Sequence, residues 1–306
     1  MVVSVAHLGP QGTYAEAAAE AYTNRLARET GQQAVLHPYP SIALTLRALA
    51  QGLTNLAVVP VENSVEGSVS MTLDTLWQLD KLQIQHALVL PISHALISCT
   101  ESLATIHTVY SHPQALAQCQ NWLEQFLPEV ELVPSKATTE ALQYLEQDKT
   151  AAAIASSRAA QLYNLPVLAC PINDYPDNYT RFWVLSLQPS TGGTHTTLAF
   201  SVPANVPGAL VKPLSCFASR GINLSRIESR PTKRSLGDYL FFIDLEAGVN
   251  EASVQSALEE LALSTETLKI FGSYSMNGTS TTDYHKSNLY PNQVKGKRTT
   301  QLLNKS

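Results

Sequence analysis

A threonine and an arginine stand side by side where a polar loop leads into an apolar segment. Residues 171–178 include two prolines, two asparagines and two aspartates, which favour turns, and residues 182–187 are apolar enough to form a buried strand. Thr180 and Arg181 therefore lie where a surface loop enters the core, a place where functional residues concentrate. A threonine hydroxyl donates one hydrogen bond, and a guanidinium is a fixed cation that binds carboxylates. The pair suits an anionic small molecule, although a loop-to-strand junction with a solvated arginine has the same pattern.

Further polar groups follow apolar segments elsewhere in the chain. Thr13 comes after the glycine-containing turn 9–12 and can cap an Ala-rich helix, whose first N–H groups can hold an anion. His112 and Ser156 each stand at the start of a predicted helix, of residues 113–126 and 157–163. The segment that follows the apolar strand predicted at residues 56–60 is unusually polar. It contains Glu62, Asn63 and Ser64.

The elements that position these groups alternate between strand and helix. This order predicts an α/β protein whose site lies along the carboxyl ends of the strands. Residues 79–100 look like a crossover between two lobes, because residues 79–90 are extended and apolar and Pro91 ends them. We therefore predict a first unit of residues 1–190 with a cleft between two lobes. One lobe comprises residues 1–78 and 179–190, and the other comprises residues 79–178.

A second unit follows the linker of residues 188–194. Strands are predicted at 196–202, 222–231, 238–246 and 268–274, with helices at 208–220 and from Asn250 onward. This βαββαβ order is ferredoxin-like and assigns the second unit to residues 195–275. Residues 276–306 are rich in Ser, Thr, Asn and Lys without periodicity, and we predict a disordered tail.

Composition narrows the classes of protein. With 306 residues, 44% apolar and 15% charged, the chain is typical of a globular protein, and its formal charge of -5 argues against nucleic-acid binding. Four cysteines lack metal-ligand spacing, so we expect no metal site and no disulfides. No leader is evident, and no apolar run approaches the ~20 residues of a membrane span. We expect a cytoplasmic protein that acts without a membrane.

Several motifs together resemble a known family. The motifs are Gly9-Pro10-Gln11-Gly12-Thr13-Tyr14, Pro60-Val61-Glu62-Asn63-Ser64, Ser111-His112-Pro113-Gln114-Ala115-Leu116 and Asn178-Tyr179-Thr180-Arg181-Phe182. They resemble, in order, the signatures of prephenate dehydratases. Gly208-Ala209-Leu210-Val211 and Ile227-Glu228-Ser229-Arg230-Pro231 resemble the two effector motifs of that family's ACT domain.

The resemblance implies a fold and a reaction. The catalytic domain would have two lobes like a periplasmic binding protein, followed by a ferredoxin-like ACT regulatory domain, in a homodimer or homotetramer. The enzyme would be a carbon–oxygen lyase that converts prephenate to phenylpyruvate without a cofactor, under feedback control by L-phenylalanine. The effector residues implied are Gly208, Ala209, Leu210, Asn223, Leu224, Glu228 and Ser229.

The same resemblance assigns roles in the cleft. Thr180 would donate to the leaving oxygen, Arg181 would clamp a carboxylate, and Phe182 would line the ring pocket. Glu62 or His112 could instead serve as the acid. The remaining substrate-binding residues implied are Thr13, Glu62, Asn63, Ser64 and Ser156.

Two residues depart from the pattern of the prephenate dehydratase family, and two other functions remain as alternatives to prephenate dehydration. Ala15 removes one possible donor, and Pro213 would delete a backbone hydrogen bond inside the helix predicted at 208–220.

An arogenate dehydratase would perform the same elimination on the amino-acid analogue. A non-catalytic amino-acid sensor would have the same two units but no need for Thr180 beside Arg181.

Overall fold

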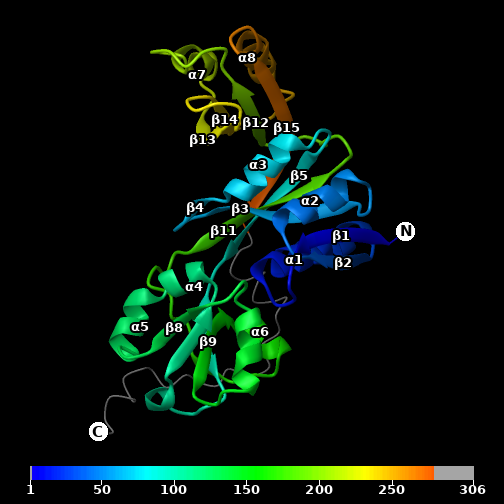
Figure 1. Cartoon of the computed structure of the whole chain (residues 1–306). Helices are drawn as coiled ribbons and strands as arrows, with labels where there is room; N and C mark the ends of the chain where they lie inside the picture. The colour runs from blue at the N-terminus through cyan, green and yellow to red at the C-terminus, as the bar shows by residue number, and fades with distance from the viewer. Residues whose placement is uncertain (1, 279–306) are drawn as a thin grey trace.

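The computed structural model describes residues 2–278, in which two sheets form two lobes (Figure 1). The first lobe carries three helices, α1 (Tyr14–Thr30), α2 (Ile42–Ala50) and α3 (Ser70–Gln78). Its strands are β1 (Val3–Leu8), β2 (Ala34–Tyr39), β3 (Leu56–Asn63), β4 (Gly67–Ser68), β5 (Gln83–Pro91) and β11 (Tyr179–Ser186). In residues 2–278, no helix has both the length and the apolar character to cross a membrane.

The second lobe is a five-stranded sheet in the order β10-β6-β9-β7-β8. The strands are β6 (His94–Ser98), β7 (Thr108–Ser111), β8 (Glu131–Pro134), β9 (Ala151–Ser156) and β10 (Val167–Ala169). The helices are η1 (Leu103–Thr105), α4 (Pro113–Ala117), α5 (Gln120–Phe126), η2 (Glu140–Glu146) and α6 (Ser157–Leu162). The helix predicted at 113–126 is thus two helices, because the backbone leaves the helical region at Cys119.

The two-lobed α/β architecture is confirmed, but the boundary between the lobes is not where we predicted it. Strand β5 pairs with β11 along its whole length and belongs to the first lobe, so residues 79–91 are not part of the second. The chain crosses between Pro91 and His94 and returns between β10 and β11. A buried strand and a crossover have the same apolar composition, which explains the error.

The C-terminal unit has the predicted ferredoxin-like βαββαβ order. It comprises β12 (His195–Ser201), α7 (Val211–Ala218), β13 (Leu224–Pro231), β14 (Tyr239–Leu245), α8 (Ala252–Ala262) and β15 (Thr267–Gly278). Helix α7 starts at Val211, so Pro213 lies in its first turn, where a backbone N–H has no intrahelical acceptor. The predicted loss of a hydrogen bond at Pro213 is therefore wrong.

Strand β15 joins this unit to the first lobe. Its earlier part pairs with β12, and residues 275–278 pair in parallel with β5. The two units therefore share one ten-stranded sheet. Residues 276–278 belong to this strand rather than to a disordered tail, and the rest of the predicted tail lies outside the described residues.

The hydrophobic clusters on the two faces of this sheet also connect the first lobe with the C-terminal unit. One cluster packs α1 on the sheet of the first lobe and includes Val5, Phe182 and Val184. Another cluster lies on the other face, against α2 and α3, and combines Trp183 of β11 with Phe242 of β14. The first lobe and the C-terminal unit thus bury apolar surface against each other, which favours a fixed arrangement between them.

Candidate active site

A cleft of about 1030 Å³ opens between the two lobes. The first lobe lines it with the turn before α1, the start of α2 and the segment from β3 to α3. The second lobe lines it with the start of β6, with α4 and with the segment before η2. Thr180 and Phe182 of β11 complete the wall.

Thr180 is held at this wall by a side-chain amide. It is 8% exposed, and Asn63 Nδ2 donates to its Oγ1 at 2.9 Å and to Asn178 Oδ1 at 2.7 Å. Strands β3 and β11 are antiparallel neighbours with Asn63 opposite Thr180, so the sheet register brings the two side chains together.

The orientation of the Asn63 amide leaves the Thr180 hydroxyl hydrogen free. Asn63 Oδ1 accepts the backbone N–H groups of Val65 and Glu66, both at 3.0 Å, so the Nδ2 side must face Thr180. An amide nitrogen only donates, and Thr180 Oγ1 is therefore the acceptor. Within residues 2–278 no acceptor takes the threonine's own hydrogen. Thr180 thus presents a hydrogen-bond donor beside the cleft.

Gln118 and His94 extend this network, and neither was predicted. Gln118 Oε1 accepts from Asn178 Nδ2 at 2.9 Å and lies 2.9 Å from His94 Nε2. Because a carbonyl oxygen only accepts, His94 carries its hydrogen on Nε2. Burial lowers the pKa of His94, with Gln118 opposing the shift, so the ring is neutral. Gln118 was part of a predicted helix and His94 of an apolar segment, and neither had a distinguishing pattern in the sequence.

Arg181 does not face the cleft. Its Nη2 lies 2.8 Å from Glu62 Oε2 and 2.8 Å from Asp244 Oδ2 of the C-terminal unit. Neither Arg181 nor Glu62 is among the residues that line the cleft. The Arg181 guanidinium is thus engaged by two carboxylates of the protein outside the cleft lining, an arrangement that disfavours the predicted carboxylate clamp and a substrate contact or acid role for Glu62.

Ser64 and Ser156 are structural ties rather than cleft groups. Ser64 Oγ donates to Asp177 O at 3.1 Å and accepts from Tyr179 N at 2.9 Å, which holds the loop that precedes β11. Ser156 caps α6 and donates to Gly12 O at 3.3 Å across the two lobes. Neither serine lines the cleft, contrary to the prediction.

Thr13 and Phe182 do line the cleft. Thr13 is the N-cap of α1, and its hydroxyl accepts from Glu16 N at 3.3 Å and donates to Leu8 O at 3.1 Å. The hydroxyl is used within the protein, and what Thr13 brings to the cleft is the positive end of α1. Phe182 is 1% exposed, so it is both strand core and cleft wall.

Charge in the cleft is sparse. In the described part of the chain, Lys136 is the one lysine or arginine among the lining residues, and its ammonium forms no ion pair there. Glu66 and Glu140 line the same cleft. The sequence gave no reason to choose Lys136, because a lysine in a polar loop is usually solvated.

His112 is a poor candidate for the acid. Its Nδ1 accepts from Gln114 N at 3.3 Å, so the ring is neutral in this arrangement. Burial lowers the pKa of His112, and Glu66 offsets only part of that shift. At neutral pH the ring offers a neutral N–H and no transferable proton.

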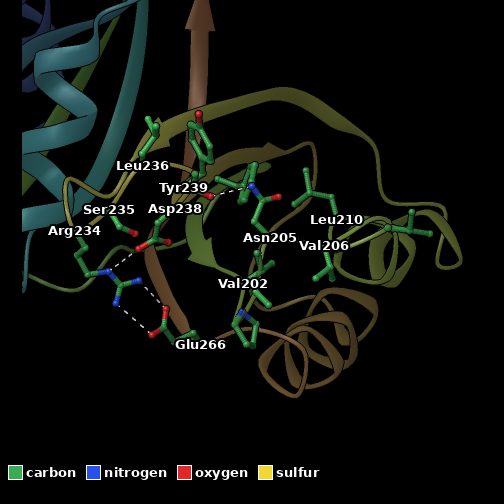
Figure 2. A pocket seen from close by; sticks show the side chains of 17 residues that line it. Val202, Asn205, Val206, Leu210, Arg234, Ser235, Leu236, Asp238, Tyr239 and Glu266 are labelled. Atoms are coloured by element: carbon green, nitrogen blue, oxygen red, sulfur yellow. Dashed lines mark hydrogen bonds and ion pairs between the residues drawn. The ribbon is translucent and has the colours of Figure 1, made fainter.

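A second pocket, of about 730 Å³, lies in the C-terminal unit (Figure 2). Gly208, Ala209 and Leu210 line it, as do residues 234–239 of the β13–β14 turn. The other predicted effector residues lie outside it: Asn223, Leu224, Glu228 and Ser229. Glu228 instead accepts from Ser68 Oγ at 3.0 Å, and the second effector motif contributes no residue to this pocket.

Comparisons with known proteins assign both units of the chain to known families. A family model described as prephenate dehydratase matches residues 5–190, and one described as ACT domain matches residues 196–263. The chain is 41% identical to the bifunctional chorismate mutase/prephenate dehydratase of Aquifex aeolicus, over 89% of this chain and 73% of that protein. It is 36% identical to the prephenate dehydratase of Lactococcus lactis subsp. cremoris, over 90% of this chain and 98% of that one. The crystal structure of prephenate dehydratase in complex with L-Phe from Arthrobacter aurescens superposes with a TM-score of 0.79 at 35% identity, covering 89% of this chain and 90% of that one.

Proposed function

The chain belongs to the prephenate dehydratase family, and we propose that it removes water and CO2 from prephenate in the cleft between its lobes. The bond from the ring carbon to its carboxylate breaks, and its electron pair completes the aromatic ring as the C4–O bond breaks. The departing hydroxide takes up a proton and leaves as water, and phenylpyruvate remains. Aromatisation drives the reaction, so the protein need only bind the dianion and stabilise the leaving oxygen.

The observation that carries the proposal is the free hydroxyl hydrogen of Thr180. The bond from Asn63 fixes Oγ1 as an acceptor on one side and directs its hydrogen to another partner. A threonine is too weak an acid to transfer its proton outright at neutral pH. Its hydrogen bond to the C4 oxygen strengthens as negative charge develops there, which lowers the barrier selectively. Solvent water then supplies the proton.

The two substrate carboxylates need partners other than Arg181. The start of α1 offers the positive end of a helix, with Thr13 and Ala15 in the cleft lining. Lys136 approaches from the second lobe, and within residues 2–278 its ammonium has no ion-pair partner. We assign one carboxylate to each, so that the substrate ties the two lobes together.

Two carboxylates in the lining favour testing the amine analogue as well. Glu66 and Glu140 would suit the ammonium of arogenate, which stands where prephenate has a keto group. The decisive assay incubates the purified protein with each compound and follows phenylpyruvate and phenylalanine separately. Phenylpyruvate from prephenate is the expected product. Turnover of arogenate alone would assign the chain to arogenate dehydratases, and turnover of neither would favour a non-catalytic sensor.

We assign the second pocket to the effector L-phenylalanine. Gly208, Ala209 and Leu210 line it, and the Arthrobacter aurescens relative was solved in complex with L-Phe. Gly208 has a φ of 82°, which a β-branched residue adopts only with strain, so Gly208→Val should reshape the pocket. We expect saturating L-phenylalanine to inhibit the wild type roughly 5- to 150-fold and this variant far less, with similar uninhibited turnover. Equal inhibition of both proteins would place the effector elsewhere.

The remaining effector residues point to an assembly. Strand β13 is at the edge of the sheet and carries Glu228 and Ser229, so a second copy could bring them to the Gly208 pocket. We propose a homodimer or homotetramer, which analytical ultracentrifugation would test. A cytoplasmic location is also proposed, supported by four cysteines that are all unpaired.

A further inference from the structure

The regulatory domain buries a carboxylate against the strand that carries Thr180. Asp244 of β14 is 0% exposed and accepts from Arg226 Nε at 2.8 Å and from Thr197 Oγ1 at 2.7 Å, both within its own domain. Its third partner is Arg181 Nη2 of β11, at 2.8 Å. The guanidinium of Arg226 also lies 5.7 Å from the ring centroid of Trp183, the next residue of β11 on that side.

This carboxylate is ionised. Burial by itself raises the pKa of Asp244, but Arg226 and Arg181 outweigh it and hold the pKa below its usual range. A buried charge is tolerated only when its partners are in place, so the geometry around Asp244 is tightly constrained. Arg181 cannot move relative to the regulatory domain without a large cost in free energy.

Arg181 fixes two strands at once. The same Nη2 that contacts Asp244 also contacts Glu62 Oε2 at 2.8 Å. Glu62 is opposite Arg181, and the next pair along the ladder is Asn63 with Thr180. Arg181 therefore ties β11 to β3 directly beside the hydrogen bond from Asn63 to Thr180.

The ladder itself is irregular at this point. Phe182 pairs with Pro60 rather than with Val61, so the register of β11 with β3 shifts between Arg181 and Phe182, one residue beyond Thr180. A bulge weakens the backbone constraint on strand direction, and bulges occur where a side chain must be aimed at a site. On its other edge β11 pairs with β5 without a shift at these residues, and the side-chain bonds of Arg181 add a constraint on the β3 side, where the ladder is irregular.

We propose that Asp244 and Arg181 are positioning residues for Thr180, so that the regulatory domain helps to aim the hydroxyl that meets the substrate. The inference rests on the proposed function, because it assigns Thr180 the contact to the leaving oxygen. It adds a direct route between the domains: a displacement of β14 moves Asp244, then Arg181, then the strand position next to it. The catalytic unit is not independent of the ACT domain, even though the two match separate family models.

A double-mutant cycle with prephenate as substrate and the full chain as enzyme tests the proposal. Asp244→Asn removes the negative charge and keeps the shape. In the otherwise wild-type protein, which keeps Thr180, Asp244→Asn should lower kcat about tenfold with little change in KM. An effect of this size is typical of the coupling between groups in one hydrogen-bond network. In the Thr180→Ala background the same change should lower kcat less than about twofold, because the group it aims is gone.

A matched control uses another ion pair between the same two domains. Asp74 of α3 pairs with Arg230 at 2.9 Å and with Lys233 at 2.8 Å, and in residues 2–278 its carboxylate makes no hydrogen bond or ion pair to β11 or Asn63. Asp74→Asn should change kcat by the same small factor in both backgrounds. If Asp244→Asn does not fold, Arg181→Lys replaces it in the cycle, since lysine keeps the charge beside Asp244 but cannot bridge two carboxylates in the same way.

The outcomes separate the inference from the proposed function. A wild-type protein that does not turn over prephenate overturns the function and the inference with it. A wild type that turns over prephenate, with Asp244→Asn equally costly in both backgrounds, shows a structural role alone and overturns the positioning role. No effect on kcat in either background overturns it as well.

Discussion

Two neighbouring residues of β11 make opposite use of polar side chains. On the cleft side, Thr180 is held by one neutral amide and keeps a free donor. On the other side, Arg181 forms ion pairs with Glu62 and with the fully buried Asp244. A polar group whose partners are all protein holds the fold, whereas a polar group with an unfilled bond at a cleft is available to a ligand. The largest expected effects follow from this division.

Thr180→Ala should break the chemical side of the comparison. Loss of one preorganised donor is expected to lower kcat by about 10²–10³ with a small change in KM, and Thr180→Ser should retain much more activity. Initial rates of phenylpyruvate formation measure both. An alanine variant within about threefold of the wild type would mean that the leaving oxygen has another donor.

Arg181→Met tests the structural role of Arg181 and should destabilise the protein. Removing one partner of a buried ion pair typically costs 3–5 kcal/mol, and because Arg226 still faces Asp244 we expect about 3 kcal/mol of unfolding free energy. KM for prephenate should stay within about twofold, since the guanidinium does not reach the cleft. Denaturant unfolding and kinetics on one preparation test both parts. Arg220→Met, in a more exposed pair with Glu260, is the control and should cost less than about 1 kcal/mol. A stable variant with a greatly raised KM would restore Arg181 as a substrate clamp.

Lys136→Met should sharpen the account of how the dianion is held. Loss of one charge-assisted contact to a carboxylate is expected to raise KM about tenfold with kcat nearly unchanged. Lys149→Met, an exposed lysine of the same lobe outside the cleft lining, should leave KM unchanged. An unchanged KM for the Lys136 variant would leave the helix N-terminus as the main carboxylate site.

The smallest effect concerns acid stability. The folded-state pKa of Asp244 lies below its usual value, so its stabilising contribution is present above about pH 4 and is lost as the pH falls through the folded-state pKa. The wild type should therefore lose a few degrees more of Tm between about pH 6 and pH 3 than Asp244→Asn does. Thermal unfolding at both pH values tests this. Asp177→Asn, at an exposed carboxylate, should follow the wild type, and parallel losses in all three proteins would exclude Asp244 as the source.

The sequence predicted the larger architecture because its signals are local and repeated. Apolar strands, capped helices and the βαββαβ order give two lobes and a ferredoxin-like unit without any knowledge of contacts. The continuity of β15 with β5 could not be predicted, because residues 275–278 have no apolar pattern and their pairing depends on a strand almost 200 residues earlier.

The sequence predicted several of the residues that line the cleft, but it did not predict which partners their side chains contact. Thr180, Phe182, Asn63 and Thr13 all line the cleft, since each lies within or shortly after a strand of the first lobe's sheet. Arg181 was assigned to substrate because it adjoins Thr180 and is a cation. Which face a strand residue takes, and whether a distant carboxylate such as Asp244 meets it, is decided by tertiary packing.

A crystal structure with an unreactive, ring-saturated analogue of prephenate would test the central claim most directly. The account predicts that the analogue's C4 hydroxyl oxygen lies within hydrogen-bonding distance of Thr180 Oγ1, about 2.5–3.0 Å. It also predicts that Arg181 keeps its contacts to Glu62 and Asp244 while the carboxylates meet Lys136 and the start of α1. A carboxylate of the analogue bound to the Arg181 guanidinium, with Thr180 away from the C4 oxygen, would contradict it.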